Sequence, residues 1–188
     1  MLERNIDLLD INLIQMKKKI EKESRFEDTL FDYSIDDMKA LLNEAIEIEA
    51  EETEDAKTRG IVKKKNGTGK YISIKNVHIS MKIILEGLAL KKDMTPISIV
   101  IFLYNLFEQL RLNISRWQMS VYMSLYEVRR TINITDENLV DVIISNIGKY
   151  GYEKLSTGKI MNTVNELYNM GLLDIDNGFY KVEEKVYY

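Results

Sequence analysis

The C-terminal segment 155–188 changes from helical to strand periodicity at one glycine, Gly171. Before this glycine, apolar residues recur at helical spacing on one face, at Ile160, Val164 and Leu167. Ser156 precedes them and can cap a helix, because its hydroxyl can accept a hydrogen bond from a backbone N–H of the first turn. We therefore expect a helix over 156–170 that ends at Gly171, since glycine favours the left-handed conformation of a helix C-cap.

A β-hairpin is expected after this helix. Leu172 to Ile175 has the length of a short strand, and the turn that follows contains Asn177-Gly178. Asn-Gly is the pair that tight hairpin turns prefer, because both residues tolerate positive φ. We expect 172–175 to pair antiparallel with 179–186.

This order of helix, glycine, strand, tight turn and strand resembles the end of a winged-helix (winged helix-turn-helix) domain. The resemblance covers about the last third of the chain. It implies that 156–170 is the recognition helix and that the hairpin is the wing. Winged helices bind DNA, and they also serve as docking subunits of larger protein assemblies, so the resemblance leaves both functions open.

The rest of the chain favours a mostly α protein of the α+β class, because helix formers dominate and Pro96 is the only proline. We expect a helical bundle with a basic β-hairpin and the C-terminal winged helix. The expected domains are 1–93, helical with a hairpin at 61–75, and 94–188, the winged helix. Thr95-Pro96 is a typical helix start, and the apolar run that follows predicts a buried central helix over 96–112.

The N-terminal residues have a heptad-like apolar pattern, at Leu2, Ile6, Leu9, Leu13, Met16 and Ile20. It predicts a helix over 1–23 that either packs on its own domain or forms a dimer seam. Because apolar surface this extensive is hard for one small chain to cover, we expect a homodimer through this seam or through 96–112. A second helix capped by Ser34 is expected to fade into the acidic run 47–55.

Charge is distributed unevenly along the chain. Residues 1–56 hold 7 Lys/Arg against 17 Asp/Glu, whereas residues 57–93 hold 10 against 2. The hairpin within the basic segment is therefore the first candidate for contact with nucleic acid. Its candidate residues are Lys63, Lys64, Lys65 and Lys70 for phosphates and Tyr71 for stacking on a base or sugar.

The recognition helix supplies the second group of candidates. With its apolar face inward, helical geometry turns Asn162 and Asn165 outward, and Lys159 and Thr163 flank them. Asparagine can form two hydrogen bonds with adenine in the major groove, and lysine and threonine suit phosphate or base contacts. Asp174 and Asp176 in the wing oppose DNA binding, because DNA is polyanionic.

No pattern indicates catalysis, a cofactor or a metal. The chain has no cysteine and a single histidine, His78. The segment 67–70 has the glycines and lysine of a phosphate-binding loop, but Lys64 stands at the first glycine position and Tyr71 at the Ser/Thr position. Because no catalytic pattern is found, we expect that the protein is not an enzyme. Neither a signal-like N-terminus nor a long apolar span is present, so we expect a cytoplasmic protein.

Two functions remain open from the sequence. One is a DNA-binding winged-helix protein, such as a transcriptional regulator or a phage or plasmid DNA-maintenance factor, with double-stranded DNA as its partner. The other is a non-enzymatic winged-helix subunit that docks another protein, which the acidic wing and the isoelectric point of about 5.3 favour.

Overall fold

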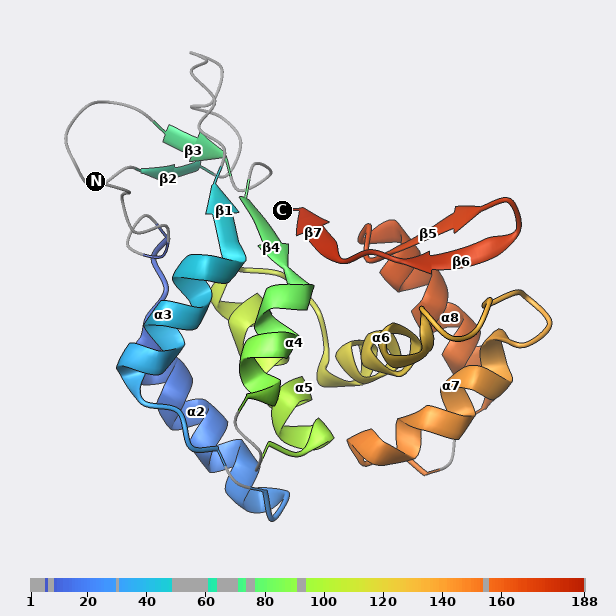
Figure 1. Cartoon of the computed structure of the whole chain (residues 1–188), viewed down its shortest axis with the longest axis horizontal. Helices are drawn as coiled ribbons and strands as arrows, with labels where there is room; N and C mark the ends of the chain where they lie inside the picture. The colour runs from blue at the N-terminus through green and yellow to red at the C-terminus, as the bar shows by residue number, and fades with distance from the viewer. Residues whose placement is uncertain are drawn as a thin grey trace. The chain divides into compact units, whose positions relative to one another are not determined.

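The structure is a computed structural model, and it describes residues 6, 9–29, 31–48, 61–63, 71–73, 77–90, 94–153 and 156–187. Helices dominate the described part, and its sheets are small and antiparallel (Figure 1). The expectation of a mostly α, α+β protein is therefore confirmed. The chain divides into two compact units. Unit 1 comprises Met1–Lys18, Asp32–Lys92 and Glu184–Tyr188, and unit 2 comprises Lys19–Phe31 and Asp93–Glu183.

Unit 1 is built on a three-stranded antiparallel sheet with the order β1-β4-β7. Its elements are α3 (Ile35–Ala45), β1 (Ile46–Ile48), β4 (Val77–Ser80), α4 (Met81–Ala89) and β7 (Lys185–Tyr187). Ile79 of β4 pairs with Ile46 of β1 on one side and with Val186 of β7 on the other. All three side chains are 0% exposed, so they form the centre of this unit's core.

The start of α3 agrees with the sequence, but its end does not. Ser34 and Asp37 form a capping box, as the serine cap predicts. The helix ends at Ala45 and the chain continues as β1, so the predicted charged helix end at 47–55 is wrong for Glu47 and Ile48. The reason is that Ile46 buries its side chain in the sheet, and its strand gains backbone hydrogen bonds to β4.

The basic hairpin is present as two short strands, β2 (Ile61–Lys63) and β3 (Tyr71–Ser73). They pair antiparallel, with Lys63 opposite Tyr71. The strands of the predicted hairpin are therefore confirmed. Its turn, which contains Lys64, Lys65 and Lys70, lies outside the described residues.

The N-terminal pattern does not form one continuous helix. The chain makes a turn at Leu9 and Asp10, and α2 (Leu13–Phe26) begins after it. Asn12 favours this start, because its side-chain oxygen accepts a hydrogen bond from the backbone N–H of Gln15 at 2.9 Å. The predicted helix over 1–23 is therefore wrong. Four of the six seam residues are nonetheless buried within the chain: Ile6, Leu9, Met16 and Ile20.

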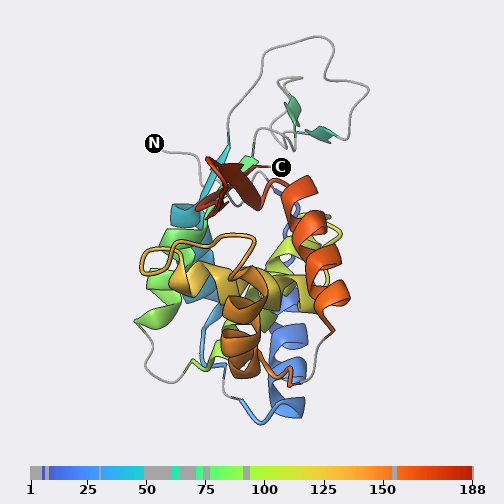
Figure 2. The same ribbon diagram turned by 90° about the vertical axis from the view of Figure 1, so that its right-hand side faces the viewer.

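Unit 2 is mainly helical. Its elements are α5 (Pro96–Gln109), α6 (Arg116–Val128), α7 (Leu139–Ile147), the 3-10 helix η3 (Gly148–Tyr150), α8 (Thr157–Asn169), β5 (Leu173–Asp176) and β6 (Phe179–Val182). Thr95 caps α5 and Pro96 is its first residue, as predicted, and most of α5 is buried. α7 and α8 pack on α6 and on each other; both are at the front in Figure 2.

One additional strand contact joins the middle of unit 2 to its hairpin. Ile134, between α6 and α7, forms an isolated antiparallel bridge with Tyr180 of β6, whose N–H donates to the Ile134 carbonyl at 2.8 Å. β6 is therefore bonded to β5 on one side and to Ile134 on the other. The order of elements is helix, short strand contact, helix, helix and hairpin.

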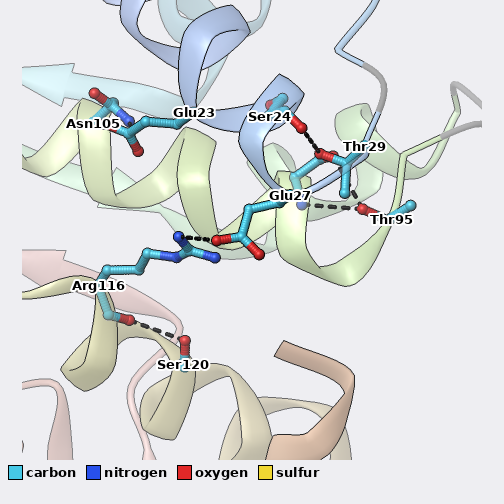
Figure 3. A network of polar contacts seen from close by, with 9 residues as sticks. Glu23, Ser24, Glu27, Thr29, Thr95, Asn105, Arg116 and Ser120 are labelled. Carbon is cyan, nitrogen blue, oxygen red and sulfur yellow. Dashed lines mark hydrogen bonds and ion pairs between the residues drawn. The ribbon is translucent and has the colours of Figure 1, made fainter. Parts of the chain in front are cut away.

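Polar contacts hold the last turn of α2 and the residue that follows it within unit 2 (Figure 3). Arg116 Nη1 donates to Glu27 Oε1 at 2.7 Å, and Asn105 Nδ2 donates to Glu23 Oε2 at 3.4 Å. The Asn105 amide also donates to the Ile101 carbonyl at 2.8 Å. These contacts explain why 19–31 belongs to unit 2 although it lies far from the rest of that unit in the sequence.

The return strand of the C-terminal hairpin is shorter than the sequence indicates. β5 pairs with β6 over 173–176 and 179–182, around the Asn177-Gly178 turn. The expected pairing up to residue 186 is wrong beyond Val182, because the chain then enters the sheet of unit 1 as β7. There the backbone N–H of Met81 donates to the Glu184 carbonyl at 2.9 Å.

Candidate nucleic-acid interface

Helix α8 has one fully buried face. Its predicted N-cap is confirmed, since the Ser156 hydroxyl accepts from the Lys159 backbone N–H at 3.3 Å. The buried face consists of Ile160, Val164 and Leu167, none more than 1% exposed. The helix ends before Gly171, which has a φ of 72°. Only glycine adopts this left-handed conformation without strain, so the predicted stop is confirmed.

The opposite face of α8 is an exposed stripe without charge. Successive residues are rotated by about 100° in an α-helix, which places one row of side chains diametrically opposite the buried face. We call this row the asparagine stripe; it consists of Gly158, Asn162, Asn165 and Asn169, all exposed. Asn162 and Asn165 were predicted to point outward, and they do.

The two charged side chains of α8 lie to one side of this stripe, against the first turn of α6. Lys159 Nζ is 4.5 Å from the centroid of the Trp117 ring, a cation–π contact. Glu166 Oε2 accepts a hydrogen bond from Gln118 Nε2 at 2.7 Å. The stripe is therefore left with amide and backbone groups only.

Thr163 was predicted to flank the open face as a DNA contact, whereas the structure buries it. It is 3% exposed, and its hydroxyl accepts from Trp117 Nε1 at 2.7 Å while donating to the Lys159 carbonyl at 2.9 Å. A buried hydroxyl with both roles filled cannot reach a base or a phosphate. Its role is to join α8 to α6.

Trp117 and Gln118 are the residues that sequence reasoning missed at this site. Ser115 and Gln118 form a capping box at the start of α6: the Ser115 N–H donates to Gln118 Oε1 at 2.6 Å, and the Gln118 N–H donates to Ser115 Oγ at 3.2 Å. The Ser-x-x-Gln spacing is a recognisable helix start. It does not reveal that the same glutamine uses its amide nitrogen to hold Glu166.

The hairpin β5–β6 presents acidic side chains. Its register pairs Asp174 with Lys181 and Asp176 with Phe179, and these four exposed residues share one face because alternate residues of a strand point the same way. Lys181 Nζ lies 3.6 Å from the Glu183 carboxylate. The only lysine of this face is thus paired with a carboxylate, which leaves the hairpin negative overall.

A hydrogen bond from Tyr180 joins β6 to the segment before α7. Its hydroxyl donates to Asp136 Oδ1 at 2.8 Å. Partial burial and this hydrogen bond to a carboxylate raise the pKa of Tyr180 to about 12. The phenol is therefore neutral, and it remains a donor, throughout the physiological pH range.

The remaining predicted contacts are described only in part. Lys63 and Tyr71 lie opposite each other in the backbone register of β2 and β3. Lys64, Lys65 and Lys70 lie outside the described residues. The structure thus brings Lys159, Asn162, Thr163 and Asn165 together on one helix, and it buries the threonine.

In the described part of the chain, no group of three or more His, Cys, Asp or Glu side chains is placed to hold a metal ion. None of the helices in the described ranges combines the length and the apolar character that crossing a bilayer requires. His78 is 4% exposed and lies in β4, where its Nε2 is 2.5 Å from Glu47 Oε2. It therefore joins β4 to β1 within the sheet of unit 1.

Comparison with known proteins finds no matching family model, no similar curated protein and no similar solved structure.

Proposed function

We propose that residues 116–182 form a winged helix that binds double-stranded DNA, with α8 as the recognition helix and β5–β6 as the wing. The order of elements supports this assignment. α6 is followed by the strand contact at Ile134, then by α7, α8 and the two-stranded hairpin, and β6 lies between Ile134 and β5.

The asparagine stripe is the observation that carries the proposal. A recognition helix must offer hydrogen-bonding groups on a face that no other part of the protein covers. Within the described residues, the exposed amides of Asn162 and Asn165 hydrogen-bond to no other side chain, whereas Thr163 and Glu166 beside them are held by α6. The open groups are therefore suited to base edges.

In this proposal, most of the affinity for DNA comes from residues outside α8. Neutralisation of phosphates supplies most of the affinity for DNA, and the α8 face offers only Lys159. The basic segment holds the densest positive charge in the chain. We assign backbone contacts to Lys63, Lys64, Lys65 and Lys70, with Tyr71 stacking beside them. A transcriptional regulator or a phage or plasmid DNA-maintenance factor would use such a division of roles.

A salt titration of binding to double-stranded DNA tests the proposal. The comparison uses wild type, a variant with alanine at the four assigned lysines, and a control with alanine at four exposed lysines outside the hairpin 61–75: Lys18, Lys22, Lys82 and Lys185. Released counterions make log K fall linearly with log salt, with a slope of about −0.9 per phosphate contact.

Loss of the assigned lysines is expected to weaken binding to all sequences alike and to flatten the salt slope by up to about four units. The control variant has the same net charge and should keep most of the slope. Absence of wild-type binding at low salt, where charges are least screened, ends the DNA proposal. An equal loss in both variants contradicts the assignment to the hairpin.

A protein-docking subunit is the second candidate function, and the acidic wing favours it. Asp174 and Asp176 are exposed, and Lys181 is paired with Glu183, so the wing repels phosphates. A winged helix of this kind binds a partner protein instead. Failure of DNA binding at low salt is the result that would select this function.

A homodimer remains a separate prediction, but less apolar surface is left to form it than the sequence suggests. The seam residues Ile6, Leu9, Met16 and Ile20 and most of α5 are buried within the chain itself. Analytical ultracentrifugation at micromolar concentration decides the matter. A mass near the 22.0 kDa of one chain ends the dimer prediction.

A further inference from the structure

We infer that α8 recognises adenine, so that the preferred DNA of this protein contains A·T pairs where the asparagine stripe meets the major groove. The inference rests on the proposed DNA binding and names its preferred base. It adds Asn169 to the contacts and gives Gly158 a role. Five observations support it: the amide chemistry, the absence of charge on the stripe, the spacing of its asparagines, the unneeded glycine and the anchoring of α8.

The chemistry of the stripe selects adenine over guanine. An asparagine side chain has an N–H₂ donor and a carbonyl acceptor, which match the N7 acceptor and the N6–H₂ donor of adenine. Guanine offers two acceptors in the major groove, and arginine or lysine is the usual partner for them. Among the described residues the stripe has neither, since Lys159 lies over Trp117.

The spacing of the stripe suits neighbouring base pairs. With a rise of 1.5 Å per residue, Asn162 and Asn165 are separated by about 4.5 Å along the helix axis, and Asn162 and Asn169 by about 10 Å. Base pairs of the duplex are stacked about 3.4 Å apart. The stripe therefore covers roughly three base-pair steps, and its two N-terminal asparagines can meet successive pairs.

Gly158 has no evident role in the fold. A Cβ at this position would meet no atom within 4 Å, and the backbone is not in the positive-φ region. Glycine is unfavourable within a helix, because it loses more conformational freedom on folding than alanine does. The residue lies at the N-terminal end of the stripe, where the lack of a side chain allows a duplex to approach the helix closely.

The anchoring of α8 fixes the direction in which the asparagines point. Trp117 donates to Thr163 nearly two turns from the helix start, and Gln118 donates to Glu166 about one turn further on. Two bonds on the same side of the helix resist rotation about its axis. Base recognition depends on this kind of positioning, because hydrogen bonds weaken steeply as their angles depart from linearity.

Selection from a library of duplexes with a randomised centre, followed by sequencing, tests the inference on the full chain. Wild type is compared with a variant that has alanine at Asn162, Asn165 and Asn169. The matched control has alanine at two exposed asparagines outside α8, Asn113 and Asn133. Affinities of the selected duplex and of its A·T-to-G·C counterpart are then measured for each protein at one fixed low salt concentration.

We expect adenine to be enriched at two or three neighbouring positions for wild type and for the control. The stripe variant should lose this preference, with discrimination falling by roughly 5- to 150-fold for each bidentate contact removed. Its affinity for unselected DNA should change little, because the phosphate contacts remain.

Three outcomes contradict the inference, and they are distinguishable. Lysine-dependent binding without base preference, or with a preference for G·C pairs, removes the adenine assignment and leaves DNA binding in place. An unchanged preference in the stripe variant moves base recognition to other residues. Absence of binding to every duplex at low salt removes the proposed function together with the inference.

Discussion

Replacement of Thr163 by valine tests the position of α8 directly. The structure buries this threonine and gives its hydroxyl two partners: it accepts from Trp117 Nε1 at 2.7 Å and donates to the Lys159 carbonyl. Valine has nearly the same shape, so the change removes the polar atom without leaving a large cavity. The main consequence is that the indole N–H of Trp117 loses its acceptor.

The expected destabilisation follows from the burial of the two partners. A neutral hydrogen bond contributes about 0.5–1.5 kcal/mol net, and a buried donor left without a partner costs about 1–3 kcal/mol. Trp117 is half-buried, so water can replace part of the lost bond. We therefore expect Thr163→Val to lower the free energy of unfolding by about 1–2 kcal/mol. For a chain of this length, that shifts the thermal midpoint by roughly 2–8 °C.

Denaturant and thermal unfolding followed by tryptophan fluorescence measure this effect, since Trp117 is the only tryptophan of the chain. Thr157→Val is the matched control, because Thr157 is exposed at the start of the same helix. Surface substitutions usually change stability by less than about 0.5 kcal/mol. Affinity for unselected DNA should change little in Thr163→Val wherever both proteins are folded, because the hydroxyl does not face the stripe. The preference for A·T pairs should weaken, because α8 loses one of the two hydrogen bonds that orient its asparagines.

Two results would refute this reasoning. Equal stability of Thr163→Val and Thr157→Val would mean that the Trp117–Thr163 hydrogen bond does not form. A large loss of affinity for unselected DNA at unchanged stability would mean that Thr163 itself contacts the DNA, as the sequence had predicted.

Three further predictions concern the stripe, the hairpin and the sheet of unit 1. Gly158→Ala should increase the free energy of unfolding by up to about 1 kcal/mol, and with it the thermal midpoint, while it weakens DNA binding. An increase in both the thermal midpoint and the DNA affinity would contradict the role given to this glycine. The raised pKa of Tyr180, about 12, means that its contribution to stability is complete below pH 10 and is lost as pH rises through 12. Ultraviolet titration should show Asp136→Asn bringing the pKa of Tyr180 down toward its ordinary value, and an unchanged value would exclude the hydrogen bond. Val186→Ala should lower the free energy of unfolding by about 2 kcal/mol, because the side chain is 0% exposed. Amide hydrogen exchange in β4 should accelerate, and an unchanged exchange rate would mean that β7 does not stabilise β4.

Features that depend on neighbouring residues were predictable from the sequence. The caps at Ser34, Thr95 and Ser156 each use a hydroxyl and a backbone N–H three residues ahead. The turn at Asn177-Gly178 uses the tolerance of these two residues for positive φ, and Gly171 ends α8 for the same reason. Such interactions form within one turn of chain, so the residue types at fixed offsets determine them.

The burial of one face of α8 and of most of α5 was predictable as well. The periodicity of α8 requires one side of this helix to be buried, whatever covers it, and the nearly continuous apolar run of α5 requires burial all round. The pattern also placed Asn162 and Asn165 on the outward face. It could not place Thr163, because a residue at the border between the buried and the open face goes to whichever side offers its hydroxyl a partner.

Only the tertiary structure decided the features that join distant parts of the chain. Ile46 leaves the helix pattern because Ile79 is available to pair with it, and the return strand divides at Val182 because β4 takes up the residues that follow. Trp117 and Gln118 become part of the interface because α8 happens to pack on the first turn of α6. The free energy of each arrangement depends on a partner dozens of residues away. The spacing of residues along the chain does not show which distant residue that partner will be.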